Sequence, residues 1–283
     1  MFGLYVHIPF CPQQCPYCAF TTVVRHDQWH ERYCRAVSRE LELATFEAEG
    51  PLDTIFFGGG TPSHIEPQYL TTILDAAQAQ FAIAPHAEIS LEANPGVADA
   101  GRFAEIRSIG FNRLSIGVQS FTDRSLKTLG RIHSGEDGVS AYEQARKAGF
   151  GNVSIDLISG VPDVPPDDWK RNIKVVTELA PEHISIYGLT VEEGTVLHDR
   201  QRQGCWQPAT EESDCWAMEY AVERLEIAGY SRYEVSNFSK PGYRSVHNWG
   251  YWTGGQYLGV GVSSHSFDGF RRFGTVHEGV IGH

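Results

Sequence analysis

The sequence lacks an uncharged apolar run of about 18 residues, so no membrane-spanning helix is expected. Its first ten residues, MFGLYVHIPF, have neither the basic segment nor the small-residue cleavage site of a signal peptide, and this predicts a cytoplasmic location. Basic side chains are scarce as well. The chain has 23 Lys and Arg against 35 Asp and Glu, a net charge of -12, which argues against a nucleic-acid partner.

Cysteine is also sparse, with six residues in a chain of 283. Three of them lie within eight positions near the N-terminus and the other three are scattered. A secreted disulfide scaffold would be shorter and richer in cysteine, so the composition indicates an ordinary globular protein with a special N-terminal cluster.

Short apolar runs alternate with longer amphipathic segments along most of the chain. The expected strands are residues 4–8, 54–57, 88–92, 113–117, 152–158 and 183–187, and the expected helices between and after them are 26–47, 67–81, 99–109, 138–147 and 166–179. Strands and helices that alternate at this spacing predict βαβ units and a parallel sheet. Six units fall short of the eight of a closed TIM barrel. We therefore expect an α/β fold with an open, partial (β/α)6 TIM-like barrel over residues 1–195, whose functional groups lie at the carboxyl ends of the strands.

The pattern changes after this barrel. Residues 196–283 predict a smaller α+β extension with one clear helix at 211–227, followed by a stretch rich in Ser, Gly, Tyr and Trp.

The cysteine cluster has the spacing C-x3-C-x2-C and consists of Cys11, Cys15 and Cys18. Three thiolates so close together can converge on one metal centre. A structural zinc site would need a fourth ligand, and no further Cys or His lies nearby at zinc-finger spacing. A [4Fe–4S] cluster held by three thiolates keeps one iron without a protein ligand, which an exogenous amine and carboxylate can chelate. Metal-free buried cysteines are the third alternative.

This array at the head of a partial βα barrel resembles the radical S-adenosylmethionine (SAM) superfamily. The resemblance implies that the amino and carboxylate groups of SAM occupy the open iron. It also implies that an electron from the reduced cluster cleaves a carbon–sulfur bond of SAM, so an electron donor is an expected partner.

Polar and glycine-rich stretches follow the expected strands in an order that resembles the porphyrin branch of that superfamily. A glycine turn alone also fits a simple turn, and a carboxylate at a strand end also fits a solvated edge. The resemblance implies SAM contacts at Tyr5, Gly59, Gly60, Thr61, Glu92, Gln119, Arg131 and Asp156. Asp156 lies in an otherwise apolar run, where a charge needs a partner. Arg131 or a ribose hydroxyl is the expected partner.

The porphyrin branch contains oxygen-independent coproporphyrinogen III oxidases and HemW-type heme chaperones. The oxidases have a cysteine two residues after the third cluster ligand, where this chain has Phe20, and they carry an N-terminal extension before the first strand. The HemW-type proteins have a His-Asn-x-x-Tyr-Trp motif, which matches residues 247–252. We therefore expect a heme chaperone, with the oxidase as the alternative.

That motif predicts a heme contact at His247, Asn248, Tyr251 and Trp252. Histidine is a common axial ligand of heme iron, and aromatic rings can pack on the macrocycle. The alternative is that the motif braces a loop and fills the core. His265 is a weaker candidate ligand. The resemblance further implies a heme acceptor protein and a C-terminal helical domain, which this chain is expected to lack.

Overall fold

The computed structural model describes residues 1–48 and 50–275 of the chain. The strands are β1 (Phe2–Ile8), β2 (Phe10–Cys11), β3 (Val23–Val24), β4 (Leu52–Gly59), β5 (Ile83–Ala93), β6 (Arg113–Gln119), β7 (Val153–Ser159), β8 (His183–Gly188), β9 (Ser231–Arg232), β10 (Asn237–Ser239), β11 (Gln256–Val260), β12 (His265–Phe267) and β13 (Arg272–Gly274). The helices are η1 (Asp27–Trp29), α1 (His30–Glu42), η2 (Pro62–His64), α2 (Pro67–Gln80), α3 (Ala100–Ser108), α4 (Asp123–Thr128), α5 (Gly135–Lys147), α6 (Pro166–Leu179), α7 (Val196–Arg202), α8 (Glu211–Ile227) and α9 (Val246–Trp252).

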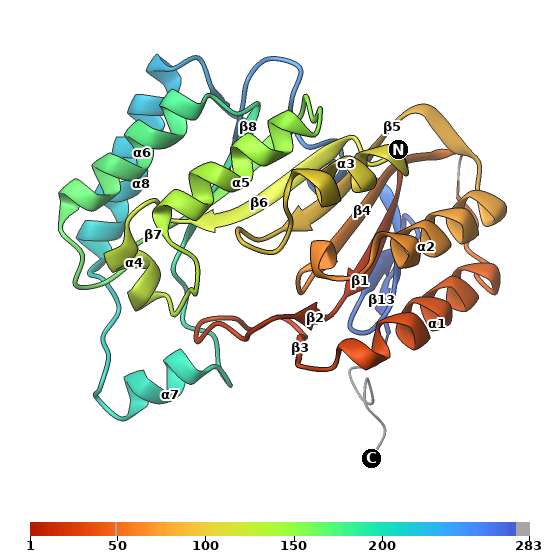
Figure 1. Cartoon of the computed structure of the whole chain (residues 1–283), viewed down its shortest axis with the longest axis horizontal. Helices are drawn as coiled ribbons and strands as arrows, with labels where there is room; N and C mark the ends of the chain where they lie inside the picture. The colour runs from red at the N-terminus through yellow and green to blue at the C-terminus, as the bar shows by residue number, and fades with distance from the viewer. Residues whose placement is uncertain (49, 276–283) are drawn as a thin grey trace.

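One curved sheet organises the molecule (Figure 1). Its strand order is β13-β12-β11-β1-β4-β5-β6-β7-β8-β10-β9, and the six strands from β1 to β8 in this order are mutually parallel. Within the described residues the sheet keeps two ends, β13 and β9, so it forms an open barrel. The expected α/β fold with six parallel strands in a partial barrel is confirmed.

Alternation along β1 separates the core from the lumen of the barrel. Leu4, Val6 and Ile8 are fully buried in the apolar core shared with the helices, whereas Tyr5 and His7 point the other way. Helices α1, α2, α3, α5, α6 and α8 cover the outer face of the sheet (Figure 1). The lumen face carries polar and aromatic side chains, among them Phe56.

Local signals explain most helix boundaries. Helices α6 and α8 have the bounds 166–179 and 211–227 that the sequence predicts, and Pro166 occupies the first turn of α6, where its missing N–H costs nothing. The Asp99 side chain caps α3 by accepting from the Arg102 N–H at 2.8 Å. Helix α1 begins later than expected, at His30, because the preceding residues form η1.

The segment after residue 195 is built into the same sheet. Strand β11 pairs in parallel with β1, and β10 pairs antiparallel with β8, so this segment lengthens the sheet at both edges. The boundary between residues 195 and 196 stays a prediction, and residues 276–283 of the expected extension lie outside the described residues. No helix in the described part of the chain is long and apolar enough to cross a membrane.

Candidate functional site

The three clustered cysteines lie just beyond the carboxyl end of β1: Cys11 ends β2, and Cys15 and Cys18 follow on the loop between β2 and β3. Cys11, Cys15 and Cys18 are free, half-buried thiols, and a turn from the Cys18 N–H to the Cys15 carbonyl at 3.0 Å shapes the loop. Thr61 Oγ1 lies 3.4 Å from Cys11 Sγ, and Arg131 Nη1 donates to Cys15 Sγ at 3.4 Å. Burial, with smaller effects from the neighbouring thiols, raises the pKa of Cys11 to about 11. The loop therefore gathers three thiols beside a cation.

The glycine turn after β4 packs tightly against the end of β1. Gly59 has φ +110°, and a Cβ there would lie 2.5 Å from the His7 ring. A Cβ on Gly60 would lie 2.6 Å from the backbone of Pro9. Glycine is required at both positions by this close approach, since a side chain would collide with β1.

Two carboxylates face the lumen near this turn. Glu92, at the end of β5, accepts from the Gly59 N–H at 3.0 Å, and desolvation together with the charge of Asp156 raises its pKa to about 7. Asp156, in β7, accepts from Ser115 Oγ at 3.0 and 3.1 Å and from Ser154 Oγ at 3.1 Å. Burial raises the pKa of Asp156 as well. Both side chains line one cavity of about 120 Å³, which therefore has two acceptors ready for a polar ligand.

Arg131 does not pair with Asp156, so that expectation is wrong. Its Nη2 donates to Asn94 Oδ1 at 2.6 Å and to the Gly117 carbonyl at 2.9 Å. Asn94 Nδ2 in turn donates to Thr61 Oγ1 at 2.7 Å. The charge of Asp156 is accommodated by serine hydroxyls instead, while Arg131 reaches toward the cysteine loop.

Asn94 is a member of the site that the sequence analysis missed. Its position two residues after Glu92, at the carboxyl end of β5, was the available signal.

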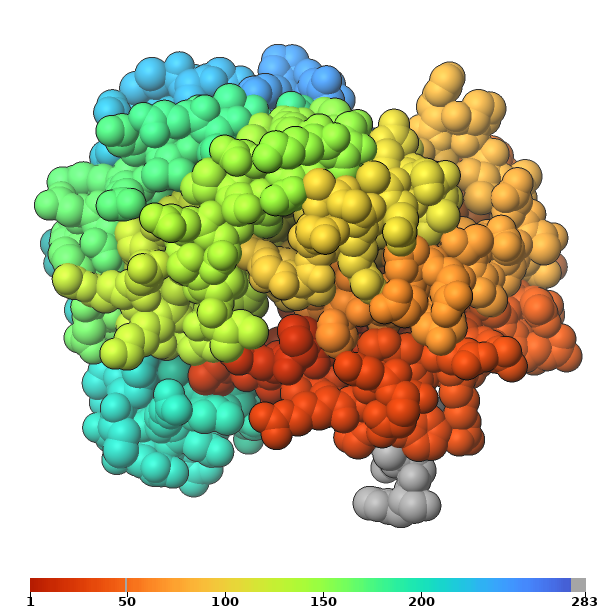
Figure 2. Space-filling view, viewed as in Figure 1, coloured from red at the N-terminus to blue at the C-terminus, as the bar shows by residue number. Residues whose placement is uncertain are grey.

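Of the remaining residues expected at the SAM site, Gln119 lies at the carboxyl edge of the sheet and Tyr5 lies in the middle of β1. Gln119 ends β6 in a left-handed conformation with φ +64°, where the register with β7 shifts. Tyr5 OH is hydrogen-bonded to His7 Nδ1 at 3.1 Å and lines the same cavity as Glu92. Figure 2 shows a hollow in the surface where the red N-terminal segment meets the yellow and green middle of the chain.

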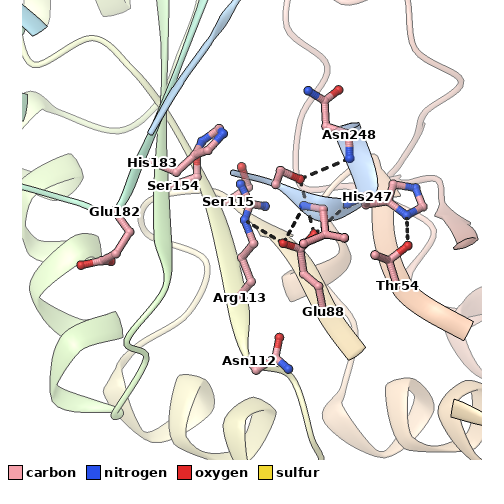
Figure 3. A network of polar contacts seen from close by, with 12 residues as sticks. Thr54, Glu88, Asn112, Arg113, Ser115, Ser154, Glu182, His183, His247 and Asn248 are labelled. Carbon is pink, nitrogen blue, oxygen red and sulfur yellow. Dashed lines mark hydrogen bonds and ion pairs between the residues drawn. The ribbon is translucent and has the colours of Figure 1, made fainter. Parts of the chain in front are cut away.

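The His-Asn-x-x-Tyr-Trp motif forms the short helix α9, which the strand-and-helix analysis did not anticipate. His247 is 3% exposed, and both of its ring nitrogens are engaged. Nδ1 is hydrogen-bonded to Thr54 Oγ1 at 2.8 Å (Figure 3), and Nε2 to Tyr251 OH at 2.8 Å. Burial lowers the pKa of His247 to about 3. His247 is therefore a neutral, fully bonded side chain within the barrel, held four residues from its partner Tyr251 on one face of the helix.

Glu88 anchors the start of α9 and was also missed. Its carboxylate accepts from the N–H groups of Val246 at 3.0 Å and His247 at 3.1 Å, and Arg113 Nε lies 3.9 Å away (Figure 3). A buried carboxylate at a helix N-terminus satisfies donors that have no partner within the helix. This network joins β5, β6 and α9 at the amino ends of the barrel strands.

The rest of the motif divides between the inside and the surface. Asn248 Nδ2 reaches Tyr233 OH at 3.5 Å. Tyr251 is 39% exposed and Trp252 is 56% exposed, so both rings reach solvent.

An open cleft of about 540 Å³ lies beside the cysteine loop. Its lining includes three exposed or half-buried rings, an exposed histidine and an arginine, namely Phe20, Tyr251, Tyr257, His265 and Arg272, together with the buried His7. Tyr5, Gly59 and Glu92 line it as well, so the cleft borders the cavity that holds the two carboxylates.

Comparisons with known proteins agree with this geometry. The model of the Radical SAM superfamily matches residues 5–176. Heme chaperone HemW of Mycobacterium tuberculosis is 40% identical to the chain, over 97% of this chain and 72% of the relative. The chain belongs to the HemW family of radical SAM proteins. A second HemW relative, from Escherichia coli, is 38% identical over 93% of this chain and 69% of its own length.

Among solved structures, coproporphyrinogen III oxidase (HemN) from Escherichia coli is similar to this HemW-family chain. The TM-score is 0.84 at 25% identity, and the match covers 98% of this chain and 67% of that one. The partial barrel is thus shared with an enzyme of the radical SAM type.

Membership of the radical SAM superfamily implies a [4Fe–4S] cluster and SAM. The donors fit such a cluster, because thiolates are its usual ligands and three of them here leave one iron open. When bound, such a cluster would be a one-electron reductant for SAM.

Proposed function

We propose that this HemW-family chain is a heme chaperone that binds heme and passes it to an acceptor protein, while a [4Fe–4S] cluster with SAM occupies the cysteine loop. The observation that carries the proposal is the cleft of about 540 Å³, which offers aromatic rings, His265 and Arg272 beside the cysteine loop. Clefts that bind cofactors are commonly of this size and are lined by rings with a few polar groups. The acceptor and the electron donor are separate proteins.

Cys11, Cys15 and Cys18 would ligate three irons of the cluster. Arg131, which donates to Cys15 Sγ, supplies a positive charge next to the thiolates and favours their deprotonated form. Thr61 Oγ1 beside Cys11 Sγ adds a second polar contact. The charge and hydroxyl therefore support the cluster from the side of the barrel.

SAM would lie between the cluster and the two lumen carboxylates. Its contacts would come from residues in or directly after five parallel strands and from Arg131, namely Tyr5, Gly59, Gly60, Thr61, Glu92, Gln119, Arg131 and Asp156. Glu92 and Asp156 accept hydrogen bonds, so they suit the amino group and the ribose hydroxyls of SAM.

For heme, we assign different roles to the two halves of the motif. Tyr251 and Trp252 reach the surface and can pack against the macrocycle, whereas His247 and Asn248 hold α9 in place from inside. His265 is exposed in the cleft and is the better axial ligand, since His247 would first have to give up two hydrogen bonds. Arg272 suits a propionate, because its guanidinium pairs well with carboxylates.

The test is an anaerobic hemin titration of the full chain carrying its cluster. We expect a shift of the Soret band on binding, a loss of this shift in His265→Ala, and its retention in His247→Gln. His86→Ala is the matched control, because His86 is exposed at the opposite end of β5 from the cleft. Absence of a Soret shift in the unmodified protein would contradict the proposal, and a loss in His247→Gln alone would return the ligand role to His247.

A coproporphyrinogen III oxidase activity is the second candidate, favoured by the likeness to HemN. Phe20 argues against this activity. The oxidases of the porphyrin branch have a cysteine at this position, whereas this chain has a phenylalanine ring that is 68% exposed. An anaerobic assay with coproporphyrinogen III, SAM and dithionite separates the two functions. We expect no protoporphyrinogen IX, and turnover would establish the oxidase instead.

A further inference from the structure

Three possible metal ligands meet outside the cysteine cluster. Asp27 lies in η1, His30 begins α1, and His64 ends η2. His64 Nε2 is 3.2 Å and His30 Nε2 is 3.5 Å from Asp27 Oδ1. One ligand atom from each residue lies within 4.8 Å of the other two, so the three side chains converge on one point.

The buried ring nitrogen of His30 is unpaired among residues 1–48 and 50–275. His30 is 6% exposed, and within these described residues its Nε2 has no hydrogen-bond partner: Asp27 Oδ1 lies 3.5 Å away but without hydrogen-bond geometry. Phe10 packs on the ring at 4.4 Å between centroids and holds it in place. A hydrogen bond between Asp27 and His64 explains those two residues, but it leaves a buried polar atom unpaired, which is costly.

We propose that Asp27, His30 and His64 bind a divalent transition-metal ion of the zinc type. Two imidazoles and one carboxylate are a common donor set for such ions, with a further position left for water. Zn–N and Zn–O distances near 2.0–2.1 Å place neighbouring ligands of a tetrahedral site roughly 3.3 Å apart. The spacings of 3.2 and 3.5 Å already match this value, and only the two histidines need to approach one another.

The charges around the site allow a cation. The charge of Glu66 raises the pKa of His30 and the charge of Arg102 lowers it, so the two charges oppose one another at this point. Arg102 is engaged elsewhere, because it donates to the carbonyls of His64 at 3.2 Å and Ile65 at 2.5 Å and lies 3.4 Å from Glu66. Asp27 faces solvent, so an ion has an open approach.

The consequence concerns two segments that flank the cysteine loop. Asp27 and His30 follow that loop in the chain, and His64 follows the glycine turn and Thr61. An ion at this point would tie the two segments together and stiffen the side of the barrel on which Thr61 meets Cys11. The metal site is separate from the proposed heme cleft, so zinc binding can be measured without heme.

Equilibrium dialysis of the full chain against Zn²⁺ tests the proposal, after anaerobic cluster reconstitution so that the three cysteine thiols are occupied. We expect one zinc per chain in addition to the cluster. Asp27→Asn and His64→Gln should each weaken zinc binding at least tenfold. His26→Gln is the control, because His26 is next to Asp27 but does not belong to the three ligands.

Two further readouts follow the ion itself. Co²⁺ should give a visible absorption band in the unmodified chain that is absent from Asp27→Asn. Zinc should raise the melting temperature of the unmodified chain and of His26→Gln, but not that of Asp27→Asn or His64→Gln. Mg²⁺ should not displace zinc, since it prefers oxygen ligands. Zinc retained equally by Asp27→Asn and His64→Gln, no zinc at all, or equal competition by Mg²⁺ would overturn the proposal.

Discussion

The two ends of the barrel lumen treat their polar groups differently. At the carboxyl ends of the strands, Cys11 lies beside Thr61 and Glu92 accepts from the Gly59 N–H, and desolvation raises the pKa of both groups. At the amino ends, both carboxylate oxygens of Glu88 and both ring nitrogens of His247 are hydrogen-bonded to α9 or β4. A polar residue in a lumen is therefore no sign of a ligand site by itself. We expect ligands at the carboxyl ends, where desolvation disfavours the charged forms of Cys11 and Glu92.

The largest effect is expected from removing a thiol at the open end. Cys15→Ser should abolish cluster binding, because a hydroxyl does not replace a thiolate on iron. Iron and acid-labile sulfide in the reconstituted protein measure the loss. Cys205→Ser is the control, since Cys205 is exposed and lies outside the cysteine loop. Full iron content in Cys15→Ser would contradict the cluster assignment.

Substitutions at the amino ends of the strands should change the stability of the chain rather than its ligand content. Glu88→Ala leaves Arg113 buried without its partner and uncaps α9, so we expect a loss of about 3–5 kcal/mol in the free energy of unfolding. Urea unfolding of the cluster-free chain measures it, and Glu143→Ala, at an exposed position of α5, should change the value by less than about 0.5 kcal/mol. A similar result for both variants would show that the cap carries little stability.

The strands were predictable because each is a short apolar run between turn signals. The polar groups at strand ends, such as Glu92 beside the glycine turn, followed from the rule that parallel strands share one functional edge. The resemblance to a known family supplied the rest of the site residues.

Partners that come from distant segments could not be read in the same way. Arg131 turns toward Cys15 and Asn94 because the loop after α4 folds over the cysteine loop, and no local pattern encodes that arrangement. The direction of His247 depends on α9, which at seven residues is too short to give a periodic signal. Glu88 is separated by more than 150 residues from the helix that it caps.

Glu92, at the carboxyl end of the lumen, should make the stability of the chain depend on pH. Its pKa is about 7 in the folded chain against 4.5 for the ordinary group, so the folded state holds the proton more tightly. The cluster-free chain should therefore lose stability as the pH rises from 4.5 to 7, by up to about 3 kcal/mol, and stay level above that range.

Glu92→Gln should remove this slope and be more stable than the unmodified chain at pH 8. Unfolding free energies at pH 5 and pH 8 measure the effect, with Glu143→Gln as the exposed control. An unchanged slope in Glu92→Gln would show that another group titrates. The same variant should bind SAM more weakly, because an acceptor is lost from the site.

The smallest effect on stability is expected at the surface of the motif. Trp252→Ala should change the free energy of unfolding by less than about 0.5 kcal/mol, because the ring is 56% exposed. Hemin affinity should nevertheless fall if the ring packs on the macrocycle. A large loss of stability with unchanged hemin affinity would show that Trp252 supports the fold, as His247 and Asn248 do, and does not contact heme.

The pairing of β1 with β11 also has a consequence for how the chain folds. Phe2 lies opposite Gln256, so one edge of the first strand waits for a partner more than 250 residues away. During synthesis at the ribosome, β4 can join β1 early, but the other side of β1 stays an uncovered strand edge until β11 emerges. Such edges invite wrong pairing, and contacts so distant in sequence form slowly. The strand that leads into the cysteine loop therefore keeps an edge open to wrong pairing until almost the whole chain has been made.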